Sequence, residues 1–264
     1  MIDLGTEPIA ATLPSVTLDR DELDLLVDVL HIDELPVVLD AGPRFDSVRA
    51  RDAALERGRA SLTSAGRLDG ETVHFELARW LLTLARPRSE IALRWHVDGS
   101  VSRLCLARDD DGAVLALRGG ETFLLQPPGH DPLGTLAHTL GTSEPLPFAV
   151  INRPTAELST ALDRISHPDT AAAELIAIGV PAPDAAIVGP ALAGCNAFAE
   201  IVGIAHEDGY PDLIRGPVTV YDTAAGRAVG TTSVAADGVA WTSLSPGTPV
   251  RLRQALTTLL SQSG

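Results

Sequence analysis

The chain has 264 residues, of which 45% are hydrophobic and 21% charged, so it can bury a substantial core in one large domain or two fused lobes. Its formal net charge of −15 repels phosphate backbones and anionic headgroups, which disfavours nucleic acid as a partner. All 20 basic residues are Arg, and this excludes mechanisms built on a lysine, such as a Walker A site or a Schiff base.

The beginning of the chain predicts a strand followed by three helices. An apolar stretch over residues 13–18 indicates the strand, and Asp19 with Glu22 three positions later is typical of a capped helix start. A charged helix is expected over residues 45–65 from its composition, and a further helix over residues 72–85, where apolar residues recur with the helical period.

The next segment changes to a period of two, which predicts a four-strand antiparallel meander. The first hairpin of the meander turns at Asp98-Gly99, a dipeptide that strongly favours a two-residue turn. Two more strands are expected over residues 113–117 and 122–126, and a helix begins after Asp131, its N-cap, with Pro132 at the first helical position.

The second part of the chain repeats this order. Helices are expected near residues 155–165 and 170–178, followed by a connection interrupted by Pro181, Pro183 and Pro190. Four strands then follow, with a turn at Asp208-Gly209, over residues 201–205, 217–221, 228–234 and 239–243. The final helix is expected after Thr248 as cap and Pro249 as first residue.

The two parts therefore share one pattern, in which helices precede a four-strand meander and a capped helix closes it. Residues 90–99 resemble residues 200–209 at an offset of 110, which suggests an internal duplication; a chance similarity of two αβ segments is the alternative. We predict an α+β fold, residues 1–264 forming a single domain with antiparallel meanders, flanking helices and two quasi-repeated halves of about 13–140 and 150–262. A pseudo-twofold axis is expected to relate the halves.

The candidate chemical groups do not form a catalytic pattern. Cys105 and Cys195 lack the spacing of a zinc or redox site, and no catalytic, cofactor or metal residue is assigned. A hydrolase or metal-binding protein stays open as an alternative only if His96 and His206 meet with nearby carboxylates. The sequence shows neither a secretory signal nor an apolar run long enough for a bilayer, so a cytoplasmic protein without membrane insertion is expected.

One surface of the first hairpin indicates binding. A two-residue turn pairs Val97 with Ser100, and the register then sets Leu93 and Ile91 on a face that should be buried. The other face pairs Arg94 with Arg103 and His96 with Val101, and two like charges directly opposite are unfavourable unless something complements them. The simpler interpretation is the solvated side of an ordinary sheet.

Three stretches of the sequence resemble the EspG family, the cytoplasmic chaperones of type VII (ESX) secretion systems. The first is the helix opening LDRDEL at residues 18–23 with DELP at 33–36; the second runs from ALERG at 54–58 to LARP at 84–87. The third is GPVTVYDTAAGR at 216–227, followed by DGVAW at 237–241 and the last amphipathic helix.

The resemblance implies a non-enzymatic chaperone that binds the apolar tip of the PPE protein in a PE–PPE heterodimer, keeps it soluble and directs it to the secretion machinery. It implies a contact on the central sheet and the C-terminal helical region. We expect Arg94, His96, Val101 and Arg103 to form part of this contact, with Arg251, Gln254 and Thr258 on the exposed side of the final helix beside them. A scaffold for a non-PPE partner is the remaining alternative, and the sequence leaves open whether the free protein forms a homodimer.

Overall fold

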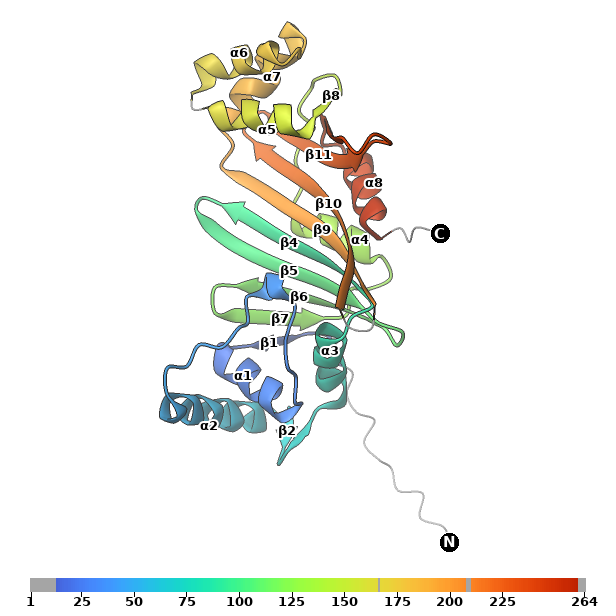
Figure 1. Cartoon of the computed structure of the whole chain (residues 1–264). Helices are drawn as coiled ribbons and strands as arrows, with labels where there is room; N and C mark the ends of the chain where they lie inside the picture. The colour runs from blue at the N-terminus through green and yellow to red at the C-terminus, as the bar shows by residue number, and fades with distance from the viewer. Residues whose placement is uncertain (1–12, 166, 208–209, 261–264) are drawn as a thin grey trace.

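The computed structural model describes residues 13–165, 167–207 and 210–260, and one ten-stranded antiparallel sheet runs through its length (Figure 1). The strand order is β1-β7-β6-β5-β4-β9-β10-β11-β12-β8. The strands of the first half are β1 (Val16–Leu18), β4 (Ser89–Val97), β5 (Ser100–Arg108), β6 (Ala113–Gly119) and β7 (Thr122–Gln126). Those of the second half are β8 (Ile151–Pro154), β9 (Ala197–Glu207), β10 (Tyr210–Thr223), β11 (Gly226–Val234) and β12 (Ala240–Pro246).

The two halves of the sheet have the same arrangement on either side of the central pair, β4 and β9. In each half, four strands follow one another in chain order from the centre outwards, and the first strand of that half forms the edge. The register of β4 and β9 sets Glu90 opposite Ile204, Ala92 opposite Val202 and Arg94 opposite Glu200. Positions 110 residues apart thus exchange places across the pair, and a pseudo-twofold axis passes between Ala92 and Val202. The predicted α+β fold with two quasi-repeated meanders is confirmed; the division of one domain at residues 13–140 and 150–262 stays a prediction.

Helices lie on both faces of the sheet and at its two ends (Figure 1). The first half carries α1 (Arg20–Val29), the 3₁₀ helix η1 (Val37–Leu39), α2 (Val48–Ser64), α3 (Phe75–Ala85) and α4 (Pro132–Thr139). The second half carries α5 (Thr155–Arg164), α6 (Pro168–Ala177), α7 (Ala182–Ala193) and α8 (Pro249–Leu260). The capping box of α1 is formed as expected, since Asp19 accepts from the backbone N–H of Glu22 and Glu22 accepts from that of Asp19.

One side of the sheet, which we call face A, is covered by α4 and α8. Ile91, Leu93, Leu104 and Leu106 point to this side and pack with Leu136 of α4 and with Leu252, Leu256 and Leu259 of α8 in one buried cluster. A side chain at Gly203 would overlap the carbonyl oxygen of Leu259, so a glycine in β9 lets α8 lie directly on the strand.

The opposite side, face B, is covered only towards its two ends. In the first half, α1, α3 and η1 bury Ala92, Cys105 and Ala116 together with Trp80. In the second half, α5, α6 and α7 cover Ala228 and Leu244. Because two separate helical layers share this face, a stretch of β4, β5 and β9 between them stays partly exposed.

Three local expectations were wrong. Thr72 and Val73 form strand β3 opposite β2 (Leu68–Asp69), so helix α3 begins only at Phe75. The proline-rich connection contains helix α7, because Pro183 lies in its first turn, where a proline costs no hydrogen bond, and Pro190 lies near its end. Strand β8 was not expected. The turn expected at Asp208-Gly209 lies outside the described residues.

Arg227 joins the end of the first half to the second. Its buried guanidinium pairs with the Asp222 carboxylate at 2.7 and 2.8 Å and donates to the carbonyls of Leu140 at 2.7 Å and Gly141 at 3.1 Å, just after α4. Its backbone N–H donates to the carbonyl of Glu144 at 2.7 Å. The Asp222-to-Arg227 segment singled out in the sequence therefore holds the connection between the halves in place.

A candidate partner-binding strip on face B

The hairpin of β4 and β5 has the predicted register. Asp98 and Gly99 have φ values of 47° and 79°, as a two-residue turn with two left-handed positions requires. Arg94 lies opposite Arg103, His96 opposite Val101, and Val97 opposite Ser100. Face A thus receives the large aliphatic residues Ile91, Leu93, Leu104 and Leu106, and face B receives the two arginines.

We call the partly exposed part of face B the central strip and define it as Arg94, His96, Val101, Arg103, Phe198 and Glu200. Its residues come from β4, β5 and β9, and neighbouring strands align them because Arg94 also faces Glu200 and His96 also faces Phe198. The strip lies beside the pseudo-twofold axis, between the two helical layers of face B.

The paired arginines of the strip continue into a row of three. Arg103 lies opposite Arg94 on one side and opposite Arg118 of β6 on the other. Asp40, at the end of η1, approaches both Arg103 and Arg118, with O–N distances of 3.3 and 3.1 Å. Glu121 also pairs with Arg118, at 3.6 Å, so two carboxylates complement the row. Exposed Arg94, in contrast, has no ion pair within residues 13–165, 167–207 and 210–260.

Asp40 and Arg118 were missed by sequence reasoning. Arg118 follows from the register once β5 and β6 are paired, so a complete pairing of the meander would have found it. Asp40 is 63 residues from Arg103 in the chain and reaches it because η1 packs on the sheet, for which the sequence carries no signal.

The imidazole of His96 is held between an aromatic ring and a carboxylate. Its ring stacks on Phe198 with centroids 4.4 Å apart and planes 6° apart, and Nε2 lies 3.9 Å from Oε2 of Glu200. Phe198 and Glu200 are two residues apart on β9, so both side chains point to face B. Sequence reasoning did not connect them with His96, because antiparallel pairing between the two halves decides the contact.

A groove with a mixed polar and apolar lining adjoins the strip at Phe198. It has a volume of about 390 Å³ and lies between α5, the end of α7 and the sheet. Leu162, Ile165 and Leu192 contribute apolar side chains, and Tyr221 lies on the strand that pairs with Phe198. Burial raises the pKa of the Tyr221 phenol. The strip therefore combines a cationic end at Arg94 with an apolar end at Phe198, beside this groove.

The predicted residues of the final helix lie elsewhere. Arg251, Gln254 and Thr258 are exposed on α8, but the opposite side of α8 packs on face A. The expectation that they stand beside Arg94 and Arg103 is wrong, because the sheet separates the two groups. Helical periodicity indicates which side of a helix is apolar and not which face of a sheet receives it.

The geometry also contradicts the hydrolase or metal-binding alternative. His96 faces Phe198, whereas the backbone N–H of His206 donates to the carbonyl of Arg88, eight residues back along β4. At about 3.3 Å per residue the two histidines are roughly 26 Å apart along the strands. In the described part of the chain, no group of three or more His, Cys, Asp or Glu side chains is arranged to hold a metal ion.

Among the described helices, none combines the length and apolar character of a transmembrane segment.

Comparisons with known proteins agree along almost the whole chain. The model of the EspG family matches residues 19–258. The ESX-3 secretion-associated protein EspG3 of Mycolicibacterium smegmatis is 29% identical over 239 residues, covering 88% of this chain and 82% of the relative. The ESX-1 secretion-associated protein EspG1 of Mycobacterium tuberculosis is 27% identical over 266 residues, covering 97% of this chain and 90% of the relative.

A solved structure has the same fold. It is that of the type VII secretion system chaperone EspG5 of Mycobacterium tuberculosis in complex with a PE25–PPE41 dimer. The match has a TM-score of 0.75 at 19% sequence identity and covers 93% of this chain and 95% of the other.

Proposed function

The chain belongs to the EspG family, and on that premise we propose that it is a cytoplasmic chaperone of a type VII secretion system whose cargo is a PE–PPE heterodimer. It acts by binding rather than by catalysis. It covers the apolar tip of the PPE protein, keeps the heterodimer soluble and directs it to the secretion machinery. The secretion-associated relatives, and a structural neighbour solved with a PE25–PPE41 dimer, support this role.

The observation that carries the proposal in this chain is the central strip. Covering the exposed apolar end of a cargo removes apolar area from water, which favours association. The groove of about 390 Å³ beside Phe198 offers apolar surface for such an end. Arg94 and Arg103 supply positive charge on a chain of net charge −15, and this charge selects a partner region that is apolar and acidic.

Co-expression with PE–PPE pairs from the same genome tests the function. We expect one pair to co-elute with the protein on affinity purification and size-exclusion chromatography, and to be less soluble without it. Failure of every pair to co-elute, with the protein itself folded, would contradict the chaperone function and leave a scaffold for a different partner.

A matched pair of substitutions tests the site. Arg94→Glu and Arg251→Glu make the same charge change at exposed arginines on opposite faces of the sheet. We expect Arg94→Glu to weaken capture of the heterodimer at least tenfold, about 1.4 kcal/mol, and Arg94→Glu/Arg103→Glu to weaken it further. We expect Arg251→Glu to retain capture. The reverse result would move the contact to Arg251, Gln254 and Thr258 on α8.

A further inference from the structure

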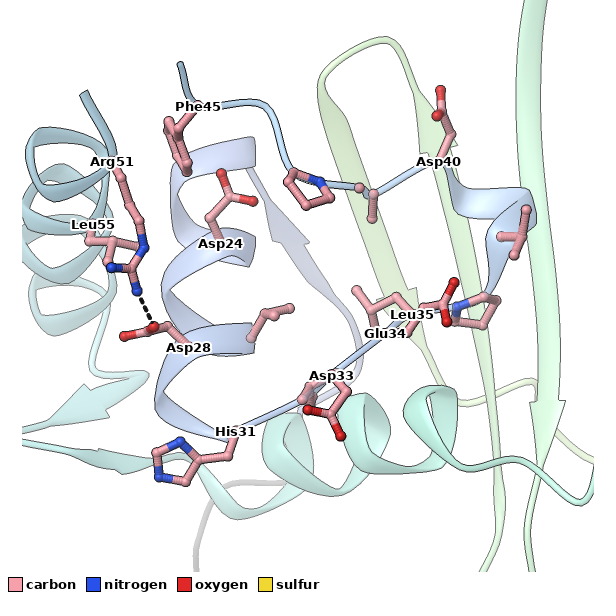
Figure 2. A pocket seen from close by; sticks show the side chains of 17 residues that line it. Asp24, Asp28, His31, Asp33, Glu34, Leu35, Asp40, Phe45, Arg51 and Leu55 are labelled. Atoms are coloured by element: carbon pink, nitrogen blue, oxygen red, sulfur yellow. Dashed lines mark hydrogen bonds and ion pairs between the residues drawn. The ribbon is translucent and has the colours of Figure 1, made fainter. Parts of the chain in front are cut away.

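A second groove lies on the first half of the molecule and meets the cationic end of the central strip at Asp40, which lines the groove and pairs with Arg103. Its volume is about 840 Å³, and it is bounded by α1, the segment of residues 31–45 and α2. Figure 2 shows α1 along the floor, with Phe45 and Leu55 on one side and Leu35 on the other. We call it the N-terminal groove.

The lining of the N-terminal groove is both apolar and acidic. Leu35, Val37, Phe45 and Leu55 contribute apolar side chains, and Asp24, Asp28, Asp33, Glu34 and Asp40 contribute carboxylates. Arg51 is the one arginine in the lining and pairs with Asp28. The lining thus carries a clear excess of negative charge.

Two of these carboxylates are available to a partner. Asp24 pairs with Arg20 and Arg44, and Asp40 pairs with Arg103 and Arg118. Asp33 and Glu34 are exposed, and neither forms an ion pair with any residue that the structure describes. Asp33 and Glu34 directly precede Leu35, so negative charge and apolar surface adjoin along one wall (Figure 2).

The shape of the groove fits a polypeptide better than a small molecule. Sites for small ligands bury most of the ligand, whereas here Val37 is 74% exposed and both free carboxylates face solvent. A group of apolar side chains with charged residues at its rim is typical of a surface that a second chain covers, and Leu35, Val37 and Phe45 form such a group beside Asp33 and Glu34.

We propose that the N-terminal groove is a docking site for a protein segment with apolar residues flanked by arginine or lysine. The basic side chains of the segment would pair with Asp33 and Glu34, and its apolar side chains would cover Val37, Leu35 and Phe45. Charge complementarity selects this occupant, because the acidic wall repels an acidic segment. Asp33 and Glu34 do not belong to the central strip, so variants at these two positions test the groove separately from cargo binding.

The binding of a defined probe tests the proposal. The probe is a short labelled peptide of leucine, alanine and arginine, and its counterpart carries glutamate at every arginine position. By fluorescence anisotropy at low ionic strength we expect saturable binding of the arginine peptide alone. The variant Asp33→Asn/Glu34→Gln is expected to bind it about tenfold more weakly, because two exposed ion pairs are lost. Val37→Asn should also weaken binding, because it removes apolar surface without adding a charge.

A matched control separates the groove from the overall charge of the chain. Asp69→Asn/Glu71→Gln removes two exposed carboxylates from the β2–β3 hairpin outside the groove and should leave binding unchanged. Equal binding of both peptides, or an equal loss in the control variant, would overturn the proposal. A dimer in light scattering that dissociates on Val37→Asn would also overturn it, since a second copy of the chain would then occupy the groove.

Discussion

Two glutamate–histidine pairs occupy corresponding places in the two halves and differ in their surroundings. Glu90 and Glu200 are 110 residues apart, as are His96 and His206, and antiparallel pairing of β4 with β9 brings Glu90 to His206 and Glu200 to His96. The Glu90 and His206 side chains are 7% and 10% exposed, with 3.4 Å between Oε1 and Nε2. Those of Glu200 and His96 are 51% and 32% exposed.

The difference arises in the helical layers rather than in the sheet. The second carboxylate oxygen of Glu90 accepts a bond from the Cys105 thiol at 3.3 Å, and Cys105 belongs to the core beneath α1 and α3. His96 stacks instead on Phe198, beside the groove under α5 and α7. The same pair of residue types is therefore part of the core in one place and part of the central strip in the other.

The largest expected effect concerns Arg227, which holds the connection between the two halves in place. Arg227→Leu leaves Asp222 without its cation and the carbonyls of Leu140 and Gly141 without a donor. We expect the free energy of unfolding to fall by about 3 kcal/mol. Urea denaturation measures the loss.

The exposed pair between α4 and α8 supplies the control for this variant. Arg253 and Asp131 form two hydrogen bonds at 2.7 and 2.9 Å, but both side chains are more than half exposed. Arg253→Leu should therefore cost much less than Arg227→Leu. Equal losses would show that Arg227 does not join the halves.

The next effect addresses the two glutamates directly. Glu90→Ala leaves the buried thiol of Cys105 and imidazole of His206 without their partner, and we expect a loss of about 2 kcal/mol. Glu200→Ala, at the exposed counterpart, should change stability by less than about 0.5 kcal/mol. Chemical denaturation of both variants under the same conditions compares them. Similar losses in the free energy of unfolding would mean that the two glutamate–histidine pairs contribute equally to stability.

The smallest effect concerns thiol reactivity. Burial raises the pKa of Cys105 well above its usual range, with the negative charge of Glu90 adding to it, and burial raises that of half-buried Cys195 as well. Because the thiolate is the reactive form, we expect Cys105 to react with N-ethylmaleimide at least about tenfold more slowly than Cys195 in the folded protein. Peptide mass spectrometry over a time course resolves the two sites. Faster modification of Cys105 would show that its end of face B opens to solvent.

Much of the local structure could be predicted. The Asp98-Gly99 turn and the period of two determined the register of β4 and β5, since a two-residue turn leaves one pairing of the flanking strands. The final helix began where expected, with the Thr248 hydroxyl accepting from the backbone N–H of Arg251 at 3.2 Å. Helix α7 was not predicted, because Pro181, Pro183 and Pro190 suggested a loop. Pro181 lies just before the helix and Pro183 in its first turn, where a proline is compatible with a helix.

The candidate site was predictable only in part. The grouping of Arg94, His96, Val101 and Arg103 on one face was predictable because their strands are neighbours in the sequence, whereas their contact with a partner stays a prediction. Phe198, Glu200 and Asp40 join them through contacts between distant segments, and no local pattern indicates such contacts. Arg251, Gln254 and Thr258 were assigned to the wrong side of the sheet for the same reason.

The sequence by itself determined the order of elements, the alternation along each strand and the similarity of the two halves, because turns, caps and periodicity depend on residues close together in the chain. Tertiary structure alone decided which histidine is buried, which face α8 covers and where the sheet stays exposed. These outcomes depend on how two helical layers of different size divide face B, and packing between distant segments sets that division.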